Sequence, residues 1–175
     1  MAFVRPEEVI KNIGLEPGMV VADFGAGSGH YSIAAARIVS KTGKVYSIDI
    51  QKELLNAIKS TAGISNLSNI EIIWSDLEIP EGSRLASGSA DAVIISNVLF
   101  QAGNKEAVLK EALRIVKDDG KVAVIEWSAE SGKTGPPLEN RISKSDCLDL
   151  FAKTGFNLAK EFMAGENHYG LLFKK

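Results

Sequence analysis

Val20-Val21-Ala22-Asp23-Phe24-Gly25-Ala26-Gly27-Ser28-Gly29 is the most informative segment of this chain of 175 residues. The apolar run at 19–24 predicts a buried strand, and the alanine-rich segment 31–39 after the glycines predicts a helix. Glycine suits a backbone that turns sharply from a strand into a helix and approaches a ligand closely. In open α/β sheets the ligand lies beyond the carboxyl ends of the strands, so this turn predicts a binding site.

The rest of the chain continues the alternation of strand and helix. Further strands are predicted at 44–48, 70–74, 92–95 and 122–127, and helices at 51–60 and 105–116. Strands separated by helices indicate a mostly parallel sheet with right-handed crossovers. We expect an α/β fold, a Rossmann-like three-layer sandwich with a seven-stranded sheet, in a single domain spanning residues 1–175.

The end of the chain departs from this alternation. After a helix near 145–153, two strands are predicted at 156–163 and 168–173, joined only by Ala164-Gly165-Glu166-Asn167. This connection is too short for a crossover, so the two strands should pair antiparallel as a hairpin.

Composition excludes several classes of protein. The formal net charge of -2 offers no basic excess for nucleic acid or an anionic membrane, so neither partner is expected. The single cysteine, Cys147, and two histidines give neither an internal disulfide nor a metal cluster. No long apolar run predicts a membrane span, and the first ten residues do not resemble a signal peptide, so we expect a cytoplasmic protein.

Glycine spacing separates two kinds of cofactor. A dinucleotide fingerprint is G-x-G-x-x-G, whereas this turn is G-x-G-x-G and is followed by His30. Asp49 ends the next predicted strand about 20 residues beyond Gly29, where a carboxylate can accept both hydroxyls of a ribose. Asp49 could instead cap the helix that begins near Gln51.

Taken in order, these segments resemble the class I S-adenosylmethionine-dependent methyltransferases over nearly the whole chain. Segment 23–29 is similar to their first motif, 47–50 to the second and 75–77 to the third. Segment 90–99 is similar to the fourth, and 113–122 resembles the approach to strand five. The closest likeness within the family is to the small-molecule, type 11 enzymes of ubiquinone and menaquinone biosynthesis.

The resemblance implies binding of S-adenosyl-L-methionine, release of S-adenosyl-L-homocysteine, and methyl transfer to a small organic acceptor by in-line displacement. Asp49 would hold the ribose, Asp76 and Leu77 would frame the adenine, and the glycine turn would admit the methionine portion. The full set of expected cofactor-binding residues is Asp23, Gly25, Ala26, Gly27, Ser28, Gly29, Tyr31, Asp49, Ile50, Asp76, Leu77, Ser96 and Asn97.

Candidate acceptor-binding residues are Phe100 and Gln101 after strand four, and Glu126 and Trp127 at the end of strand five. Arg141 is a further candidate in the polar segment 128–141, which is either a surface loop or a flap over the site. Glu126 could be a general base or only a solvated strand end, and Arg141 could grip an anion or lie at the surface. His168 is predicted to be structural or exposed rather than catalytic. No catalytic residue or oligomeric state is assigned, since transfer from an activated sulfonium can depend mainly on alignment.

Two other functions remain open. The chain could be a non-catalytic module that binds S-adenosylmethionine, or a nicotinamide-dependent oxidoreductase. Asp76 and Tyr31 also have structural interpretations, as an ordinary turn residue and as a core aromatic.

Overall fold

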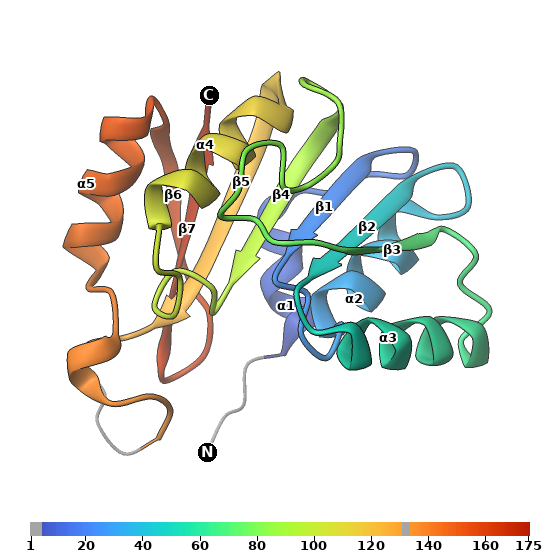
Figure 1. The fold of residues 1–175 in the computed structure, drawn as a ribbon, viewed down its shortest axis with the longest axis horizontal. Coiled ribbons are helices and arrows are strands. Elements are labelled where there is room, and N and C mark those ends of the chain that lie inside the picture. The colour runs from blue at the N-terminus through green and yellow to red at the C-terminus, as the bar shows by residue number, and fades with distance from the viewer. Residues whose placement is uncertain (1–4, 131–133) are drawn as a thin grey trace.

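A seven-stranded sheet with the strand order β3-β2-β1-β4-β5-β7-β6 forms the centre of the computed structural model, which describes residues 5–130 and 134–175 (Figure 1). The strands are β1 (Val20–Phe24), β2 (Lys44–Asp49), β3 (Ile70–Trp74), β4 (Ala90–Ser96), β5 (Val116–Trp127), β6 (Asn157–Met163) and β7 (His168–Lys174). The helical segments are α1 (Pro6–Val9), η1 (Ile10–Ile13), α2 (His30–Val39), α3 (Lys52–Ile64), α4 (Lys105–Ile115), η2 (Leu138–Asn140) and α5 (Lys144–Thr154).

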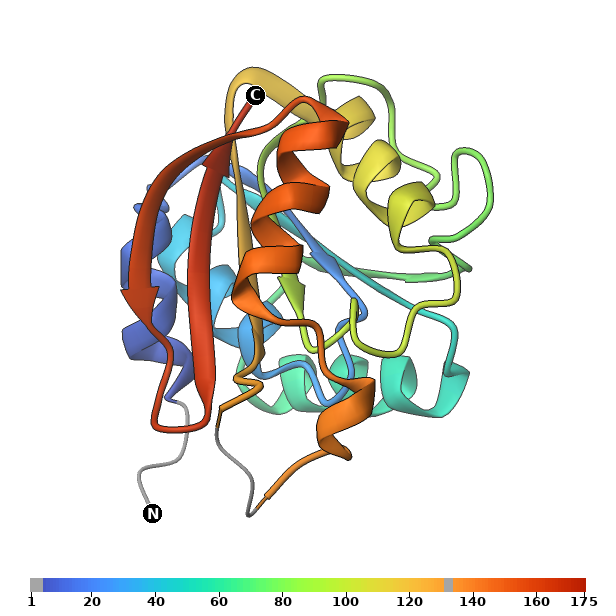
Figure 2. The same cartoon turned by 90° about the vertical axis from the view of Figure 1, so that its left-hand side faces the viewer.

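Strands β1 to β5 pair in parallel, and the last two strands run against each other. β7 pairs antiparallel with both β5 and β6, with Trp127 opposite His168 at one end. Figure 2 shows this hairpin at the front of the molecule. The predicted α/β class, the seven-stranded sheet and the reversed hairpin are therefore confirmed.

Helices cover both faces of the sheet because successive strand residues point to opposite sides. Val93 and Ile95 of β4 join the core beneath α4 and α5, whereas Ala92 and Ile94 join the core beneath η1 and α2. All four are at most 1% exposed, as expected for a strand buried on both faces. Figure 2 shows the two helical layers on either side of the sheet.

Two boundaries differ most from the prediction. Helix α3 continues to Ile64, and β5 begins at Val116, six residues before the expected start at Val122. Ala90 pairs with Val116 but Ala92 pairs with Lys121, so the intervening residues bulge out of register. The Asp-Asp-Gly sequence at 118–120, which indicated a turn, therefore forms an irregularity within one long strand.

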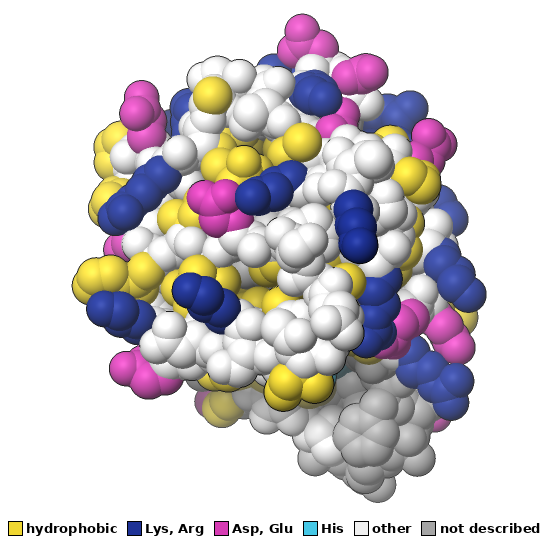
Figure 3. Space-filling model, turned by 90° about the vertical axis from the view of Figure 1, so that its right-hand side faces the viewer, with side chains coloured by type: hydrophobic (Ala, Val, Ile, Leu, Met, Phe, Trp, Pro, Cys, Tyr) yellow, Lys and Arg dark blue, Asp and Glu magenta, His cyan; other side chains and the backbone are white. Residues whose placement is uncertain are grey.

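The described helices include none that is long and apolar enough to cross a membrane. On the side of the molecule shown in Figure 3, hydrophobic side chains alternate with lysines, arginines and acidic residues. This side therefore presents no continuous basic surface of the kind that binds nucleic acid.

Glu111 on α4 stabilises the long loop between β3 and β4. Its carboxylate accepts hydrogen bonds from the Ser83 backbone N–H (2.8 Å), the Ser83 hydroxyl and the Arg114 guanidinium (2.7 and 2.8 Å). Because Glu111 is 4% exposed, Glu111→Ala should lower the free energy of unfolding by about 2 kcal/mol, since it leaves buried donors unpaired. Urea denaturation measures this loss.

Glu106→Ala on the same helix is the matched control. Glu106 pairs with Lys110, and both side chains are more than 60% exposed, so its loss should change stability much less. Equal effects of the two substitutions would show that the buried hydrogen bonds of Glu111 contribute nothing to the free energy of unfolding.

Candidate functional site

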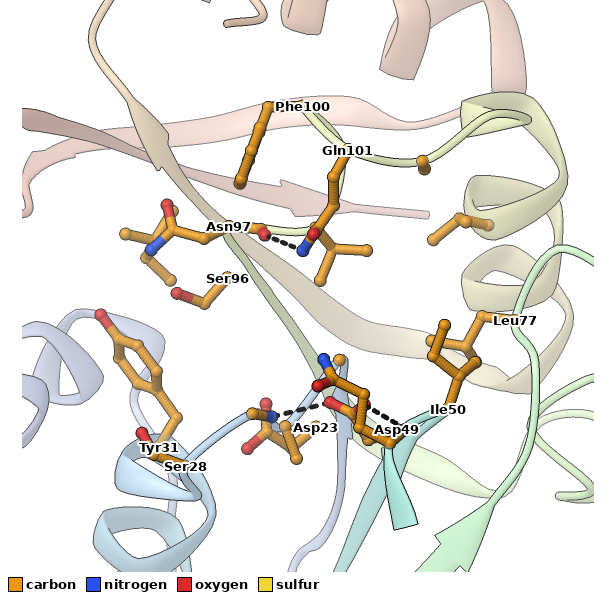
Figure 4. A pocket seen from close by; sticks show the side chains of 18 of the residues that line it. Asp23, Ser28, Tyr31, Asp49, Ile50, Leu77, Ser96, Asn97, Phe100 and Gln101 are labelled. Carbon is orange, nitrogen blue, oxygen red and sulfur yellow. Dashed lines mark hydrogen bonds between the residues drawn. The ribbon is translucent and has the colours of Figure 1, made fainter. Parts of the chain in front are cut away.

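A cavity of about 700 Å³ opens at the carboxyl ends of the parallel strands, where the sequence places its motifs. Its wall comes from the turn after β1, the ends of β2, β3 and β4, and the start of β7. Most of the expected cofactor-binding residues line it: Asp23, Gly25, Ala26, Gly27, Ser28, Tyr31, Asp49, Ile50, Asp76, Leu77, Ser96 and Asn97. Figure 4 shows ten of the lining side chains by name.

The glycine turn is fixed to the neighbouring strand by its own backbone. The N–H groups of Gly25 and Ala26 donate to the Ile48 carbonyl at 2.8 and 3.0 Å. Gly25, Gly27 and Gly29 all have positive φ angles, of 66°, 52° and 80°, which favour glycine. The turn therefore depends on these three glycines for its backbone conformation.

Two of these glycines also make room for packing. A Cβ at Gly25 would lie 2.4 Å from Val98 Cγ2, and one at Gly29 would lie 2.5 Å from Ile58 Cγ1. Gly29 does not line the cavity, contrary to its expected role beside the ligand. Of the three glycines, Gly27 alone combines a place in the cavity wall with open space for an added Cβ, whose nearest atom would be the Gly25 carbonyl oxygen at 3.8 Å.

Asp49 holds the glycine turn and the start of α3 together. Its Oδ2 accepts from the Gly27 N–H at 2.9 Å, and its Oδ1 accepts from the Gln51 N–H at 2.8 Å (Figure 4). Gln51, not Asp49, is the N-cap residue of α3, but Asp49 accepts from its N–H and so also supports the start of this helix. Each carboxylate oxygen keeps acceptor capacity, since an ionised carboxylate has about four lone-pair sites.

Asp23 lies deeper, at the end of β1. It is 1% exposed, and its Oδ2 accepts from the Ser32 hydroxyl at 2.5 Å, which in turn accepts from the Ser47 hydroxyl at 2.7 Å. Burial raises the pKa of Asp23 to about 7, although the Ser32 hydrogen bonds act in the opposite direction. Asp23 can therefore change its charge near neutral pH in response to a bound cation.

One end of the cavity is apolar. Ile50 and Leu77 line it, and Figure 4 shows their side chains on the same side of the cavity. Asp76 lies next to Leu77, and its Oδ1 accepts from the Glu78 N–H at 2.8 Å. Asp76 therefore also acts as a turn residue, which was the structural interpretation of this position. The other oxygen of Asp76 has no hydrogen bond among those found in the described chain, and it can accept from a ligand bound at this end.

Tyr31, Ser96 and Asn97 line the other end. Figure 4 shows the Tyr31 ring rising from α2 toward the side on which Ser96 and Asn97 lie. The Tyr31 hydroxyl and Asn97 Oδ1 are buried without a hydrogen-bond partner in the described residues. Burial raises the pKa of Tyr31 above its ordinary value, so the phenol stays neutral and can donate. Asn97 has a φ of 56°, a left-handed conformation that asparagine tolerates.

The candidate acceptor-binding residues divide into two groups. Phe100, Gln101 and Trp127 line the cavity, but Glu126 and Arg141 do not. The Glu126 side chain is fully buried, and its Oε1 accepts from the Leu99 N–H at 2.7 Å, so it supports the turn after β4. Burial raises the pKa of Glu126 to about 7.

Arg141 braces the loop that follows β5. Its guanidinium donates to the carbonyl oxygens of Ser128 (2.7 Å), Thr134 (2.5 Å) and Pro136 (3.0 Å). It also lies over the Trp127 ring, 5.5 Å from the centroid. Residues 131–133 of this loop, part of the flap expected at 128–141, lie outside the described residues.

Sequence reasoning missed several residues of the cavity wall, and three of them lie after β5 in the chain. Thr134, Asn167 and His168 line it, although the sequence indicated a structural or exposed role for His168. They enter the site because β7 pairs with β5, which places His168 opposite Trp127. No motif or local period in the sequence signals that contact.

The glycine turn allows a matched pair of substitutions. Gly27→Ala should lower the free energy of unfolding by about 1 kcal/mol. The added Cβ meets no close neighbour, so the loss comes only from the left-handed backbone conformation. Gly25→Ala should cost about 2–4 kcal/mol, because the same penalty is joined by the overlap with Val98. Denaturation of both variants measures the difference, and equal losses would contradict the packing role of Gly25.

The sheet order, the glycine turn and the carboxylate at the tip of β2 together define a Rossmann-like domain with a nucleoside-sized site at its strand ends. The chain belongs to the methyltransferase domain family, whose model matches residues 15–168. The predicted class, an S-adenosylmethionine-dependent methyltransferase domain, is confirmed at the level of family and fold.

Known proteins resemble the chain both in sequence and in structure. A structure described as a SAM dependent methyltransferase from Aquifex aeolicus superposes with a TM-score of 0.88 at 28% identity, covering 98% of this chain and 89% of that one. A ubiquinone/menaquinone biosynthesis C-methyltransferase of Hydrogenovibrio crunogenus is 34% identical over 85% of this chain and 56% of its own length. A demethylmenaquinone methyltransferase of Oceanobacillus iheyensis is 30% identical over 70% of this chain and 50% of its own. The chain thus spans about half the length of these two relatives.

Proposed function

We propose that this chain transfers the methyl group of S-adenosylmethionine to a small organic acceptor. The observation that carries the proposal is the position of Asp49, whose carboxylate bonds the Gly27 N–H at 2.9 Å while lining the cavity. A glycine turn tied to an acidic strand tip is the arrangement that receives a ribose at the edge of an α/β sheet. Family membership supports the same cofactor, and nothing in the comparisons favours a nicotinamide cofactor.

The residues of the wall fit each part of that cofactor. Asp49 would accept the ribose hydroxyls, while Ile50 and Leu77 would cover the faces of the adenine and Asp76 would accept from its amino group. Gly27 offers an open backbone to the methionine portion, and the buried carboxylate of Asp23 would favour its ammonium group. When bound, the cofactor supplies an electrophilic sulfonium methyl.

The chain's own residues then orient the acceptor and exclude water. Ser96 ends β4 and Asn97 follows it, at the end of the cavity that Tyr31 also lines, and Phe100 and Trp127 supply apolar surface for an organic molecule. Holding the cofactor and the acceptor at near-attack distance can account for a large part of the rate enhancement of methyl transfer. The names of the relatives support a small-molecule acceptor, since two of them are named for quinone methylation.

Isothermal calorimetry with S-adenosylmethionine, S-adenosylhomocysteine and NAD tests the cofactor. We expect binding of the first two and no binding of NAD. Release of S-adenosylhomocysteine in the presence of an acceptor panel then tests catalysis, because that product forms whichever acceptor is methylated. Binding without release from any acceptor would favour a non-catalytic module, and binding of NAD alone would overturn the proposal.

A further inference from the structure

Glu78 joins two segments of the cavity wall that lie far apart in the chain. Its Oε2 accepts from the Asn104 N–H at 2.6 Å, and its Oε1 accepts from the Gly103 N–H at 3.1 Å. Glu78 itself lines the cavity and follows Asp76 and Leu77, which line the end proposed for the adenine. A single carboxylate therefore connects the segment after β3 with the loop between β4 and α4.

The connection reaches Asp76 through the backbone. The Glu78 N–H donates to Asp76 Oδ1 at 2.8 Å, so the residue that holds Gly103 and Asn104 also orients the Asp76 carboxylate. An ionised carboxylate has about four lone-pair sites, so Asp76 keeps acceptor capacity for a ligand. A shift of Glu78 would therefore move an acceptor on one side of the cavity and a stretch of backbone on the other.

The loop that Glu78 holds forms the other side of the cavity. Phe100, Gln101 and Ala102 line the cavity immediately before the two residues whose N–H groups Glu78 accepts. The N–H groups of Gln101 and Ala102 both donate to the Val98 carbonyl, at 3.1 and 3.0 Å. The loop is thus a tight turn with its own hydrogen bonds, and its far end is fastened by Glu78.

An ordinary helix cap does not account for these bonds. Asn104 is the N-cap residue of α4 and accepts from the Ala107 N–H at 3.0 Å through its own side chain. The Gly103 N–H lies ahead of the helix, and a Cβ at Gly103 would lie 3.3 Å from Glu78 Oε2. The Glu78 carboxylate therefore fixes the loop before α4 as well as the first residue of the cap.

We propose that Glu78 is a positioning residue that couples the two sides of the cavity, so that a cofactor bound at Asp76 also fixes the loop that receives the acceptor. This inference rests on the proposed methyl transfer. Contact between the adenine and Asp76 opposes local opening of the segment after β3. Because the Glu78 carboxylate bonds the loop, the same contact orders Phe100 and Gln101, and the coupling is reciprocal.

A second route between the two sides has to be distinguished. Val98 packs against Gly25 of the glycine turn, where an added Cβ would lie 2.4 Å from Val98 Cγ2. A cofactor bound at the turn would act on the loop through this contact instead. The routes are separable because Val98 lies at the start of the loop, whereas Glu78 bonds its end at Gly103 and Asn104.

Hydrogen exchange followed by NMR tests the coupling without an acceptor. The amides of Gln101 and Ala102 are the reporters, since both donate to the Val98 carbonyl within the loop rather than to Glu78. In the wild type, S-adenosylhomocysteine should slow their exchange about 10-fold, because it suppresses local opening. In Glu78→Ala saturated with the same ligand, this slowing should vanish. Slowing that persists in the variant would assign the coupling to the contact between Val98 and Gly25, and overturn the role of Glu78.

A second measurement tests the orientation of Asp76. S-inosylhomocysteine carries an oxygen in place of the adenine amino group, so it offers Asp76 no donor there. The wild type should prefer S-adenosylhomocysteine about 10-fold, and Glu78→Ala should lose most of this preference. A variant that is only less stable would bind both ligands more weakly by the same factor. An unchanged preference in Glu78→Ala would therefore contradict the positioning role.

Two further variants serve as controls. Glu78→Gln keeps one acceptor oxygen, so it should retain part of the slowing and part of the ligand preference. Glu81→Gln removes a negative charge from an exposed position further along the same segment, and leaves the bonds to Gly103 and Asn104 in place. It should behave as the wild type. Losses in Glu81→Gln equal to those in Glu78→Ala would show that charge, not the two hydrogen bonds, is responsible.

The outcomes separate this inference from the proposed function. Failure of the wild type to bind S-adenosylhomocysteine contradicts the proposed function itself. Binding of S-adenosylhomocysteine with unchanged exchange at Gln101 and Ala102, or with equal affinity for S-inosylhomocysteine, overturns only the coupling through Glu78.

Discussion

Asp49→Ala is expected to weaken the binding of S-adenosylmethionine about 100-fold, close to 2.7 kcal/mol. A hydrogen bond to a charged group contributes about 1.5–3 kcal/mol, and under the proposed function the substitution would remove the acceptor of two ribose hydroxyls. Asp49 is only 7% exposed, so water would not fully replace it. Calorimetry on the wild type and the variant measures the change.

The same substitution also loosens the turn, and this effect has to be measured separately. The Gly27 and Gln51 N–H groups, at 2.9 and 2.8 Å, both lose their acceptor. Urea denaturation of the unliganded variant gives the cost to folding, and binding of S-adenosylhomocysteine by a variant that is folded at the assay temperature gives the cost to the site. Wild-type affinity in such a variant would refute the ribose role of Asp49.

Asp23→Asn is expected to stabilise the unliganded chain at pH 8 by roughly 2–4 kcal/mol, while weakening the binding of the cofactor. Burial raises the pKa of Asp23 from 3.8 to about 7, so the native state binds a proton more tightly than the unfolded state does. The stability contributed by this group therefore falls as the pH rises from about 4 to about 7. Asparagine removes the buried charge and can still accept from the Ser32 hydroxyl.

Denaturation of the wild type and of Asp23→Asn at pH 4 and pH 8 tests the sign of this pH dependence of stability. The advantage of the variant should be small at pH 4 and largest at pH 8, because only the wild type then carries the buried charge. Cofactor affinity of the wild type should rise between pH 6 and pH 8, since a cationic ligand favours the ionised carboxylate. The variant should not show that rise.

Glu126→Gln provides a matched control for this experiment. Burial also raises the pKa of Glu126 to about 7, but the residue does not line the cavity. Its substitution should change the pH dependence of stability in the same direction and leave cofactor affinity unchanged. A loss of affinity equal to that of Asp23→Asn would show that Asp23 acts through overall charge rather than through contact with the ligand.

Much of the cavity wall formed by the strand ends could be predicted from the sequence. Its parts lie in short segments directly after predicted strands, and the carboxyl ends of parallel strands meet at one edge of a sheet. This rule places Asp23, Asp49 and Asp76 together once their strands are recognised, and all three line the cavity. The rule does not say which glycine of the turn faces the ligand, and the structure shows that Gly29 packs against Ile58 instead.

Of the candidate acceptor-binding residues, only some lie where the sequence predicted them. Phe100, Gln101 and Trp127 follow strands and line the cavity, but Glu126 points beneath the turn after β4, where it bonds the Leu99 N–H. Neighbouring residues on a strand point to opposite faces, so a choice between Glu126 and Trp127 needs the exact register of β5. The bulge near its start, opposite Ala90 and Ala92 of the partner strand, is not encoded in any local period.

The layer architecture, the reversed hairpin and the glycine turn could be predicted from the sequence, because each depends on local periodicity, on glycine, or on a connection of only four residues. Three contacts follow from tertiary packing alone: His168 lies against Trp127, Arg141 braces a loop, and Glu126 bonds the Leu99 N–H beneath the turn after β4. These contacts join segments distant in the chain, and their geometry follows from strand register and packing rather than from any residue's immediate neighbours.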